Sequence, residues 1–262
     1  LDHGRRRASM TAGQHARRRA GSGSEFWQYR PLGPDEAVSR VDWRRSARSD
    51  DLFVRERERE EPGRLLLFAD GSGSMDFASR EDLPTKAASA RTLLTTLAIS
   101  AREAEEHVGV MGARTGLRSI DAIHAALWDT EGNTPASMTT GDGDWIVASG
   151  DFLDEGSTDW LAEAAATGAR GVILLIIDPA EAAFPFRGHT RFEPSEAGET
   201  DIDLGRAESL ADRYHEVWTA HLTAIKAFAA KLGWPLVRHI TSDGERATLR
   251  TLAAHLGGEF GQ

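Results

Sequence analysis

Short apolar segments alternate with longer amphipathic segments from residue 64 to the end of the chain. The apolar segments have the length and composition of buried strands, and the amphipathic segments have the periodicity of helices. This alternation is typical of a parallel sheet, because a parallel connection must cross the sheet and normally does so as a helix. The predicted strands are 64–69, 107–113, 145–149, 171–177 and 234–240, and the predicted helices are 84–106, 119–128, 158–167, 206–232 and 245–256. We therefore predict an α/β fold with three layers and a mostly parallel, doubly wound sheet.

Two regions interrupt or precede this alternation. Residues 178–205 are rich in proline, glycine and acidic side chains, and we expect a hairpin insertion there. Residues 1–60 form a basic N-terminal arm in which we expect short strands, because 52–58 has the period-two pattern of an edge strand. Residues 1–24 are rich in Arg, Gly and Ser, and we expect them to be mobile. The main domain should then span 61–262.

The composition excludes several classes of protein. The 262 residues include no cysteine, which excludes disulfides, thiolate metal sites and a catalytic thiol. No apolar run approaches the length of a membrane span, so we expect a soluble protein, and the lack of cysteine fits a cytoplasmic one. No two of the nine histidines have the i, i+4 spacing of a helical zinc motif, so we do not expect a zinc hydrolase. Ser72 and Ser74 lack the flanking glycines of the Gly-x-Ser-x-Gly motif, so we do not expect a serine hydrolase. Because the sequence begins with Leu1 and shows no signal core, we expect that further residues precede it.

Charge is distributed unevenly along the chain. Residues 1–60 hold 14 Lys and Arg against 10 Asp and Glu, whereas residues 61–262 hold 17 against 31. A basic arm of this kind can pack on an acidic body or contact a polyanion. The side chains that would serve either purpose are Trp43, Arg44, Arg45 and Arg48, which could form salt bridges and cation–π contacts or stack on bases.

Two predicted strands end in carboxylates beside small residues. Asp70-Gly-Ser-Gly-Ser74 follows the first strand, and Asp151 follows the third, with Asp154 close behind. Ligands of open α/β sheets bind beyond the carboxyl ends of the strands where the strand order reverses, so these two loops can converge. Oxygen ligands suit Mg²⁺ or Mn²⁺. The sequence predicts a metal site made of Asp70, Ser72, Ser74 and Asp151.

Plainer interpretations exist for the same residues. Asp70, Ser72 and Ser74 could merely cap the following helix and close a turn. Asp142-Gly-Asp144 could bind calcium, although a turn is the commoner role of such a segment. Asp178 ends the most apolar strand and is a secondary candidate for the same cleft, or else a cap of the next turn.

The spacing Asp70-x-Ser72-x-Ser74 after a strand, with a later aspartate, resembles the metal-ion-dependent adhesion site of von Willebrand factor A domains. The resemblance implies that both serines bind the metal directly and that Asp151 supplies the later carboxylate. The family also uses a threonine from a loop before a central helix. Thr115 is the nearest candidate here, and Thr134, Thr139 and Thr140 lie in the next loop, but none stands in a matching motif.

A second resemblance covers nearly the whole chain. Bacterial proteins of domain-of-unknown-function family fifty-eight are similar to it at Gly13-Gln-His-Ala-Arg-Arg-Arg-Ala-Gly21, Phe26-Trp-Gln-Tyr-Arg30, Val41-Asp-Trp-Arg-Arg-Ser-Ala-Arg48, Asp151-Phe-Leu-Asp154 and Ile177-Asp-Pro-Ala-Glu-Ala-Ala-Phe-Pro-Phe186. The resemblance implies a cytoplasmic protein that acts with a MoxR-type AAA+ ATPase in chaperone-like maturation or metal insertion. It implies no enzymatic activity. It also argues against reading the first residues as an expression tag.

These inferences favour a protein-binding module that uses its metal to bind an acidic residue of an AAA+ ATPase or of a client protein. The first alternative is nucleic-acid binding through the basic arm. The second is Mg²⁺-dependent phosphoryl transfer, for which the sequence offers no phosphate-binding loop and no evident general base.

Overall fold

The computed structural model describes residues 16–32, 41–47, 51–62, 64–113, 117–154, 156–192 and 202–257. The chain divides into two compact units, Leu1–Gly63 and Arg64–Gln262. Among the described residues, no helix combines the length and the apolarity needed to cross a membrane.

The first unit is built on a long antiparallel hairpin. Strand β1 (Ala16–Pro31) pairs with β2 (Phe53–Pro62), and the short helix α1 (Trp43–Ser46) lies between them in sequence. The strands are longer than the sequence suggested, and residues 16–24, expected to be mobile, belong to β1. In the register of the two strands, Arg17 is the partner of Glu61 and Arg18 is the partner of Glu60. Residues 1–15, which were also expected to be mobile, lie outside the described residues.

The second unit contains the parallel sheet that the sequence predicts. Its strands are β3 (Arg64–Ala69), β4 (His107–Val110), β5 (Trp145–Gly150), β6 (Arg170–Ile177) and β9 (Leu236–Ile240). They lie in the order β4-β3-β5-β6-β9, and every neighbouring pair is parallel. Strand β4 ends three residues earlier than predicted, because the chain turns at Gly112, whose φ is 79°.

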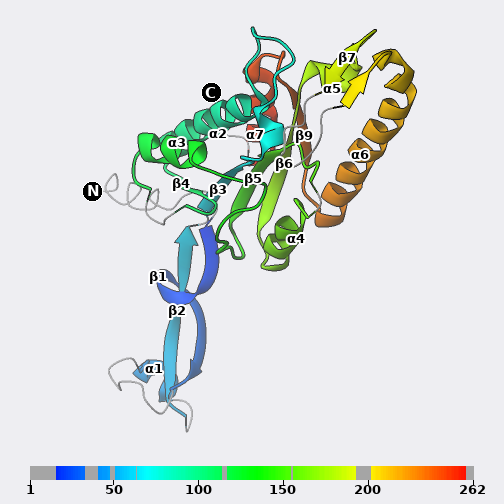
Figure 1. Ribbon diagram of the computed structural model, residues 1–262. Helices are drawn as coiled ribbons and strands as arrows, with labels where there is room; N and C mark the ends of the chain where they lie inside the picture. Colours follow the sequence, from blue (N-terminus) through cyan, green and yellow to red (C-terminus); the bar gives the residue numbers. More distant parts are fainter. Residues whose placement is uncertain are drawn as a thin grey trace. The chain divides into compact units, whose positions relative to one another are not determined.

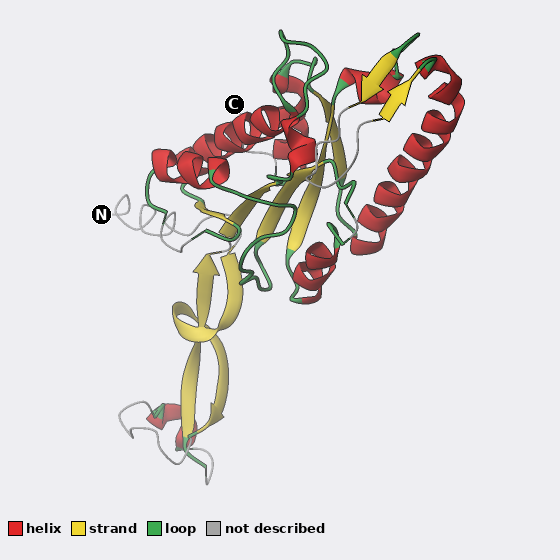
Figure 2. Ribbon diagram, viewed as in Figure 1, coloured by secondary structure: helices red, strands yellow, loops and turns green. Residues whose placement is uncertain are grey.

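Helices cover both faces of this sheet and complete three layers (Figures 1 and 2). Helices α2 (Lys86–Glu103), α3 (Ile120–Trp128) and α7 (Glu245–His255) pack on one face, and α4 (Asp159–Ala166) and α6 (Ala211–Leu232) pack on the other. Strand β3 shows why two cores form. Leu65 and Leu67 join the core beneath α2, whereas Leu66 and Phe68 join the core beneath α6, because alternate side chains point to opposite faces. The predicted α/β class is confirmed.

The segment between β6 and α6 departs from the strand–helix alternation. It contains the short helix α5 (Pro179–Ala183), the antiparallel hairpin of β7 (Thr190–Phe192) and β8 (Ile202–Leu204), and the 3-10 helix η3 (Ala207–Leu210). A second 3-10 turn, η2 (Gly73–Asp76), follows β3. Figure 1 shows α5 and β7 at the same end of the sheet, beside the start of α6.

Candidate cation site at the ends of β3 and β5

The carboxyl ends of β3 and β5 lie side by side at the point where the strand order reverses. After β3 the chain adds β4 on one side of it, and later adds β5 on the other. Asp70 directly follows β3, and Asp151 directly follows β5. The Asp70 N–H donates to the Ser149 carbonyl oxygen at 2.9 Å, which holds the two strand ends together. The predicted meeting of the two loops therefore occurs in the structure.

Two glycines allow the loops after β3 and β5 to approach each other closely. A Cβ atom on Gly71 would lie 2.1 Å from the Thr130 carbonyl oxygen, and the Gly71 N–H donates to the Gly132 carbonyl oxygen at 2.9 Å. A Cβ atom on Gly150 would lie 2.8 Å from Asp70 Oδ2. Any larger residue at these positions would displace the backbone loop or the Asp70 carboxylate.

The oxygen atoms of the four predicted ligands form one continuous series of close contacts. Ser72 Oγ donates to Asp70 Oδ1 at 2.7 Å, Ser72 Oγ lies 3.2 Å from Ser74 Oγ, and Ser74 Oγ donates to Asp151 Oδ2 at 2.7 Å. Asp70 and Asp151 are each 2% exposed, so two carboxylates from separate strands are buried in one small volume. The sequence thus identified residues that the fold brings together.

Helix capping does not account for the serines. Ser72 stands at the N-terminal cap of η2 but its side chain makes no capping hydrogen bond. The next long helix, α2, is capped instead by Thr85, whose hydroxyl accepts from the Ala88 N–H at 3.1 Å. The turn-closing role is real for Asp70 alone, since its Oδ1 also accepts from the Ser72 N–H at 2.8 Å.

The oxygen spacings are compatible with a small divalent cation. Neighbouring ligand oxygens of an octahedral Mg²⁺ lie about 2.9 Å apart, given metal–oxygen distances of about 2.0–2.1 Å. The three successive spacings in this series, 2.7, 3.2 and 2.7 Å, lie on either side of that value. No group of three or more acidic or histidine side chains in the described part of the chain is arranged to hold a metal. Two carboxylates and two hydroxyls would leave positions for water, as Mg²⁺ prefers.

The electrostatics of Asp70 are unusual for an aspartate. Burial raises the pKa of Asp70 to about 6, and the charges of Asp151 and Asp154 contribute in the same direction. The hydrogen bonds from Ser72 oppose this rise without cancelling it. A carboxylate that resists ionisation in the absence of a cation is one that a bound cation would stabilise in its charged form.

Lys86, at the start of α2, also belongs to this cluster, and the sequence did not predict this. It is 1% exposed, and its ammonium group donates to Asp151 Oδ2 at 2.8 Å and to Glu181 Oε1 at 2.5 Å. Burial opposes its charge, but the attraction of Asp151 and Glu181 outweighs burial and raises the pKa of Lys86. A lysine at a helix N-terminus is unfavourable beside the helix dipole. The unfavourable position of the Lys86 charge was therefore the feature of the sequence that could have indicated a specific acidic partner.

Two further contacts position Asp151. The Leu153 N–H donates to Asp151 Oδ1 at 3.2 Å, and His221 Nε2, from α6, lies 2.9 Å from the Asp151 carbonyl oxygen. Oδ2 therefore faces Ser74 and Lys86 while Oδ1 is held by its own loop.

The secondary candidates lie at the margins of the cluster or outside it. Asp154 Oδ2 accepts from Asn133 Nδ2 at 2.9 Å, and its charge reaches Asp70 only through space. Asp178 is completely buried and caps α5, where its Oδ1 accepts from the Ala180 N–H at 2.7 Å, while its Oδ2 accepts from the Ser79 N–H at 3.0 Å. The capping interpretation of Asp178 therefore matches the structure. Thr115 lies outside the described residues.

The other threonines and acidic residues considered have different roles. Thr140 Oγ1 lies 2.9 Å from Thr167 Oγ1, and Thr139 offers its carbonyl oxygen to Arg64 at 3.1 Å. Asp144 forms an ion pair with Arg64 at 2.6 Å and also accepts from the Gly141 N–H, so the 142–144 segment is a turn anchored to β3. No hydrogen bond places Thr134 in the cluster among the contacts described.

The candidate residues of the basic arm lie in the first unit. Asp42 caps α1, and the guanidinium carbon of Arg45 lies 5.7 Å from the ring centre of Tyr29 and 5.3 Å from that of Phe53. Trp43 is 59% exposed and Arg44 is also exposed. Arg48 lies outside the described residues. Arg45 thus packs on aromatic rings of its own unit. The two roles predicted for this group, packing on the acidic body and contact with a polyanion, stay predictions.

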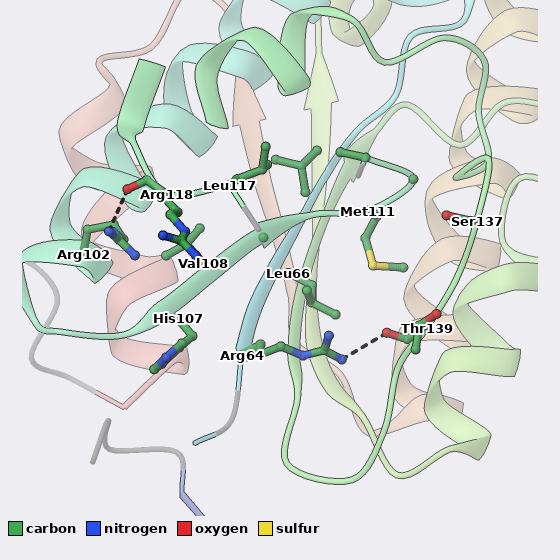
Figure 3. A pocket seen from close by; sticks show the side chains of 14 residues that line it. Arg64, Leu66, Arg102, His107, Val108, Met111, Leu117, Arg118, Ser137 and Thr139 are labelled. Carbon is green, nitrogen blue, oxygen red and sulfur yellow. Dashed lines mark hydrogen bonds between the residues drawn. The ribbon is translucent and has the colours of Figure 1, made fainter. Parts of the chain in front are cut away.

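A separate pocket of about 530 Å³ lies beside the edge strand β4 (Figure 3). Arginines supply much of its polar lining: Arg102 donates to the Arg118 carbonyl oxygen at 3.0 Å, and Arg64 reaches Thr139. Leu66, Val108 and Met111 supply apolar surface. None of the four predicted metal ligands lines this pocket, so it is distinct from the candidate cation site.

Comparison with known proteins agrees with the family resemblance. Residues 28–121 match the family described as "Protein of unknown function DUF58"; this stretch includes Asp70, Ser72, Ser74 and Lys86 but ends before Asp151. One solved structure that resembles the chain is the crystal structure of the conserved hypothetical protein BatB from Bacteroides thetaiotaomicron, with 17% sequence identity, a TM-score of 0.43, and coverage of 75% of this chain and 98% of that one. No curated protein has a sequence that matches the chain. Residues 28–121 thus match the family that the sequence resembles, the proteins of unknown function DUF58.

Proposed function

We propose that residues 64–257 form a protein-binding module of the von Willebrand factor A type, in which a divalent cation, Mg²⁺ or Mn²⁺, is held by Asp70, Ser72, Ser74 and Asp151. The observation that carries this proposal is the unbroken series of four buried or half-buried oxygen-bearing side chains across the ends of β3 and β5. The cation would supply one open coordination position, which a carboxylate of the partner protein fills.

The charge balance of the cluster favours a cation over hydrogen bonding alone. Four carboxylates, those of Asp70, Asp151, Asp154 and Glu181, contribute to the local field, and one ammonium group, that of Lys86, opposes them. Buried charges are costly unless they are paired. Lys86 is already engaged by Asp151 and Glu181, which leaves Asp70 without a cationic partner among the described contacts.

The residues of such a site would have different roles. Asp70 and Asp151 would carry the negative charge, and the serine hydroxyls would donate lone pairs without adding further repulsion. Lys86 fixes the side-chain rotamer of Asp151 from one side while the Leu153 N–H holds the other oxygen. Ligands held in place before binding lose less entropy when a cation or a partner arrives.

The partner that the family resemblance favours is a MoxR-type AAA+ ATPase, or a client protein matured with its help. We propose that the protein acts by binding and not by catalysis. This partner class rests on the resemblance of residues 13–48, 151–154 and 177–186, and the cation-dependent contact gives it a mechanism that can be tested.

The direct test is a calorimetric titration with Mg²⁺. The double variant Ser72→Ala/Ser74→Ala should lose at least about tenfold in Mg²⁺ affinity, because it removes two of four ligands while keeping the backbone turn. The matched control is Ser137→Ala/Ser209→Ala, which removes two exposed hydroxyls away from the cluster. Equal Mg²⁺ affinity in the two double variants would show that the serines do not hold a cation.

A pull-down tests the partner. The immobilised chain should retain a purified MoxR-type ATPase in Mg²⁺ and release it in EDTA, and the Ser72→Ala/Ser74→Ala variant should fail to retain it. Retention that is equally strong with EDTA and in the variant would disprove the cation-dependent contact.

A further inference from the structure

A pocket of about 640 Å³ opens directly beside the candidate cation site. It shares Ser74 and Lys86 with that site, at a polar end that also includes Glu181 and His221. Thr190 and Arg191 line the pocket as well. A pocket of this volume can enclose a large side chain together with flanking backbone. One continuous surface therefore leads from the charged cluster into a second compartment.

Five half-buried aromatic or apolar residues form the wall of this compartment. The ring centres of Phe184 and Tyr214 lie 4.5 Å apart and are stacked, those of Phe186 and Phe192 lie 5.0 Å apart edge to face, and those of Tyr214 and Trp218 lie 6.4 Å apart and are stacked. These residues come from the end of α5, the loop that follows it, the hairpin strand β7 and the first half of α6. The insertion between β6 and α6 thus serves to build this wall.

The wall is held in a strained backbone conformation. Phe184 has a φ of 43°, in the left-handed region that side chains other than glycine rarely adopt. Its N–H donates to the Ala180 carbonyl oxygen at 2.8 Å, and its ring stacks on Tyr214, whose hydroxyl donates to the Glu181 carbonyl oxygen at 2.8 Å. Phe184 is the left-handed C-cap that ends α5, and this conformation turns the chain toward the hairpin of β7 and β8.

The rim of the pocket exposes apolar side chains to solvent. Phe77 is 38% exposed, Leu153 is 47% exposed and Val217 is 54% exposed, and all three line the same pocket. Single exposed apolar residues are common, but a group of them around a concave aromatic surface marks a contact for another molecule.

From this juxtaposition we infer that the pocket receives a large apolar or aromatic side chain of a partner protein, located close in sequence to the partner's acidic residue. This inference rests on the proposed function, because the acidic residue would engage the cation at Ser74 while its neighbour enters the aromatic compartment. The polar end and the aromatic wall complement the two halves of such a segment. The partner class is thereby narrowed to exposed segments that combine Asp or Glu with Phe, Tyr, Trp or Leu.

The test uses four acetylated and amidated heptapeptides in a two-by-two design. The central residue is either aspartate or asparagine, and the residues two positions to each side are either both phenylalanine or both glycine. Affinities for the full chain are measured by ligand-observed NMR in Mg²⁺ and in EDTA. The aspartate peptide with phenylalanines should bind about tenfold or more tightly than the aspartate peptide with glycines, because a buried ring adds binding free energy.

Variants of the wall and the rim locate the effect. Trp218→Ala should abolish the gain that the phenylalanines provide and leave the binding of the glycine-flanked aspartate peptide unchanged. Since Trp218 is half-buried, Val217→Gln at the exposed rim provides a second variant that does not threaten the fold, and it should reduce the same gain. The control is Ile99→Gln, which changes a residue of similar exposure on α2 outside the pocket.

The possible outcomes distinguish a failure of this inference from a failure of the proposed function. If both aspartate peptides bind equally well in Mg²⁺ and lose binding in EDTA, the aromatic compartment is not used, and the inference is wrong while the proposed function stands. If aspartate and asparagine peptides bind alike and EDTA has no effect, the cation mechanism is wrong, and the inference fails with it. Equal gains in Val217→Gln, Trp218→Ala and Ile99→Gln would also overturn the inference.

Discussion

The second unit contains two buried polar clusters that both include a residue of helix α2, Lys86 in one and Ser89 in the other, and they differ in charge. In the edge strand β9, His239 is 1% exposed, and its two ring nitrogens lie 2.9 Å from Thr248 Oγ1 and 3.0 Å from Ser89 Oγ. Burial lowers the pKa of His239, which keeps the ring neutral. Its two hydroxyl partners satisfy both nitrogens, as is typical of a cluster that stabilises a core.

The cluster around Asp70 and Asp151 lacks this balance. It has an excess of carboxylates, a raised pKa at Asp70 and an aromatic pocket beside it. In a core cluster the polar groups need only form hydrogen bonds with one another. A binding site must instead keep some charge or hydrogen-bonding capacity that only the ligand pairs with. The difference between the two clusters is therefore the reason for regarding only the charged one as a site.

The largest effect should come from breaking the buried ion pairs. Lys86→Met should lower the free energy of unfolding by about 3–5 kcal/mol, because Asp151 and Glu181 would lose their buried countercharge. Urea denaturation measures this change. Excess Mg²⁺ should recover part of the loss, since a cation at Asp151 would replace some of the missing positive charge.

The control for this prediction is Arg80→Met. Arg80 also forms an ion pair, with Asp82 at 2.9 Å, but both side chains are largely exposed. Its loss should change the free energy of unfolding by about 0.5 kcal/mol or less. Similar changes in the two variants would mean that the charged cluster contributes no more than a surface pair.

The two clusters should respond to pH in opposite directions. The pKa of Asp70 is about 6 in the folded chain and about 3.9 when unfolded, so in EDTA its contribution to stability should fall as pH rises between those values. The expected change is about 3 kcal/mol across that interval. Comparing urea denaturation of the parent and Asp70→Asn at pH 4.5 and pH 6.5 isolates this contribution.

For His239 the sign is reversed. Its pKa is lowered in the folded chain, so the unfolded chain binds a proton first, and the contribution of the neutral ring should be lost as pH falls below its ordinary value of about 6.5. Mg²⁺ should reduce the pH dependence assigned to Asp70 and leave that of His239 unchanged. The comparison would fail if Mg²⁺ altered both or neither.

The smallest effect should come from replacing the neutral cluster. His239→Leu should cost about 1–3 kcal/mol, because the Ser89 and Thr248 hydroxyls would remain buried with fewer partners. Thermal or urea unfolding measures the loss, and calorimetry should find an unchanged affinity for Mg²⁺. A matching loss of Mg²⁺ affinity would show that the two clusters are coupled through α2 and are not independent.

Much of the fold and part of the site could be predicted from local pattern. The apolar run 64–69 and its counterparts predicted all five parallel strands, because a strand buried on both faces must be apolar throughout. Asp70, Ser72 and Ser74 could be predicted because a carboxylate and two hydroxyls at alternate positions directly follow a buried strand, in the spacing of a known type of cation site. Those inferences need only neighbours in sequence.

Tertiary structure alone decided which distant side chains share the site. Lys86, Glu181 and His221 come from three different helices. Only Lys86, a cation at a helix N-terminus, is unusual in its own segment, and that position does not identify its partners. The aromatic compartment likewise requires α5, β7 and α6 to meet, so no periodicity within one segment could reveal it. The sequence by itself determined the parallel sheet and the acidic turns at the ends of its strands, because periodicity and turn chemistry are local. The choice of countercharge and of the pocket beside it depended on packing over distances in sequence of 65 and 95 residues, from Lys86 to Asp151 and to Glu181.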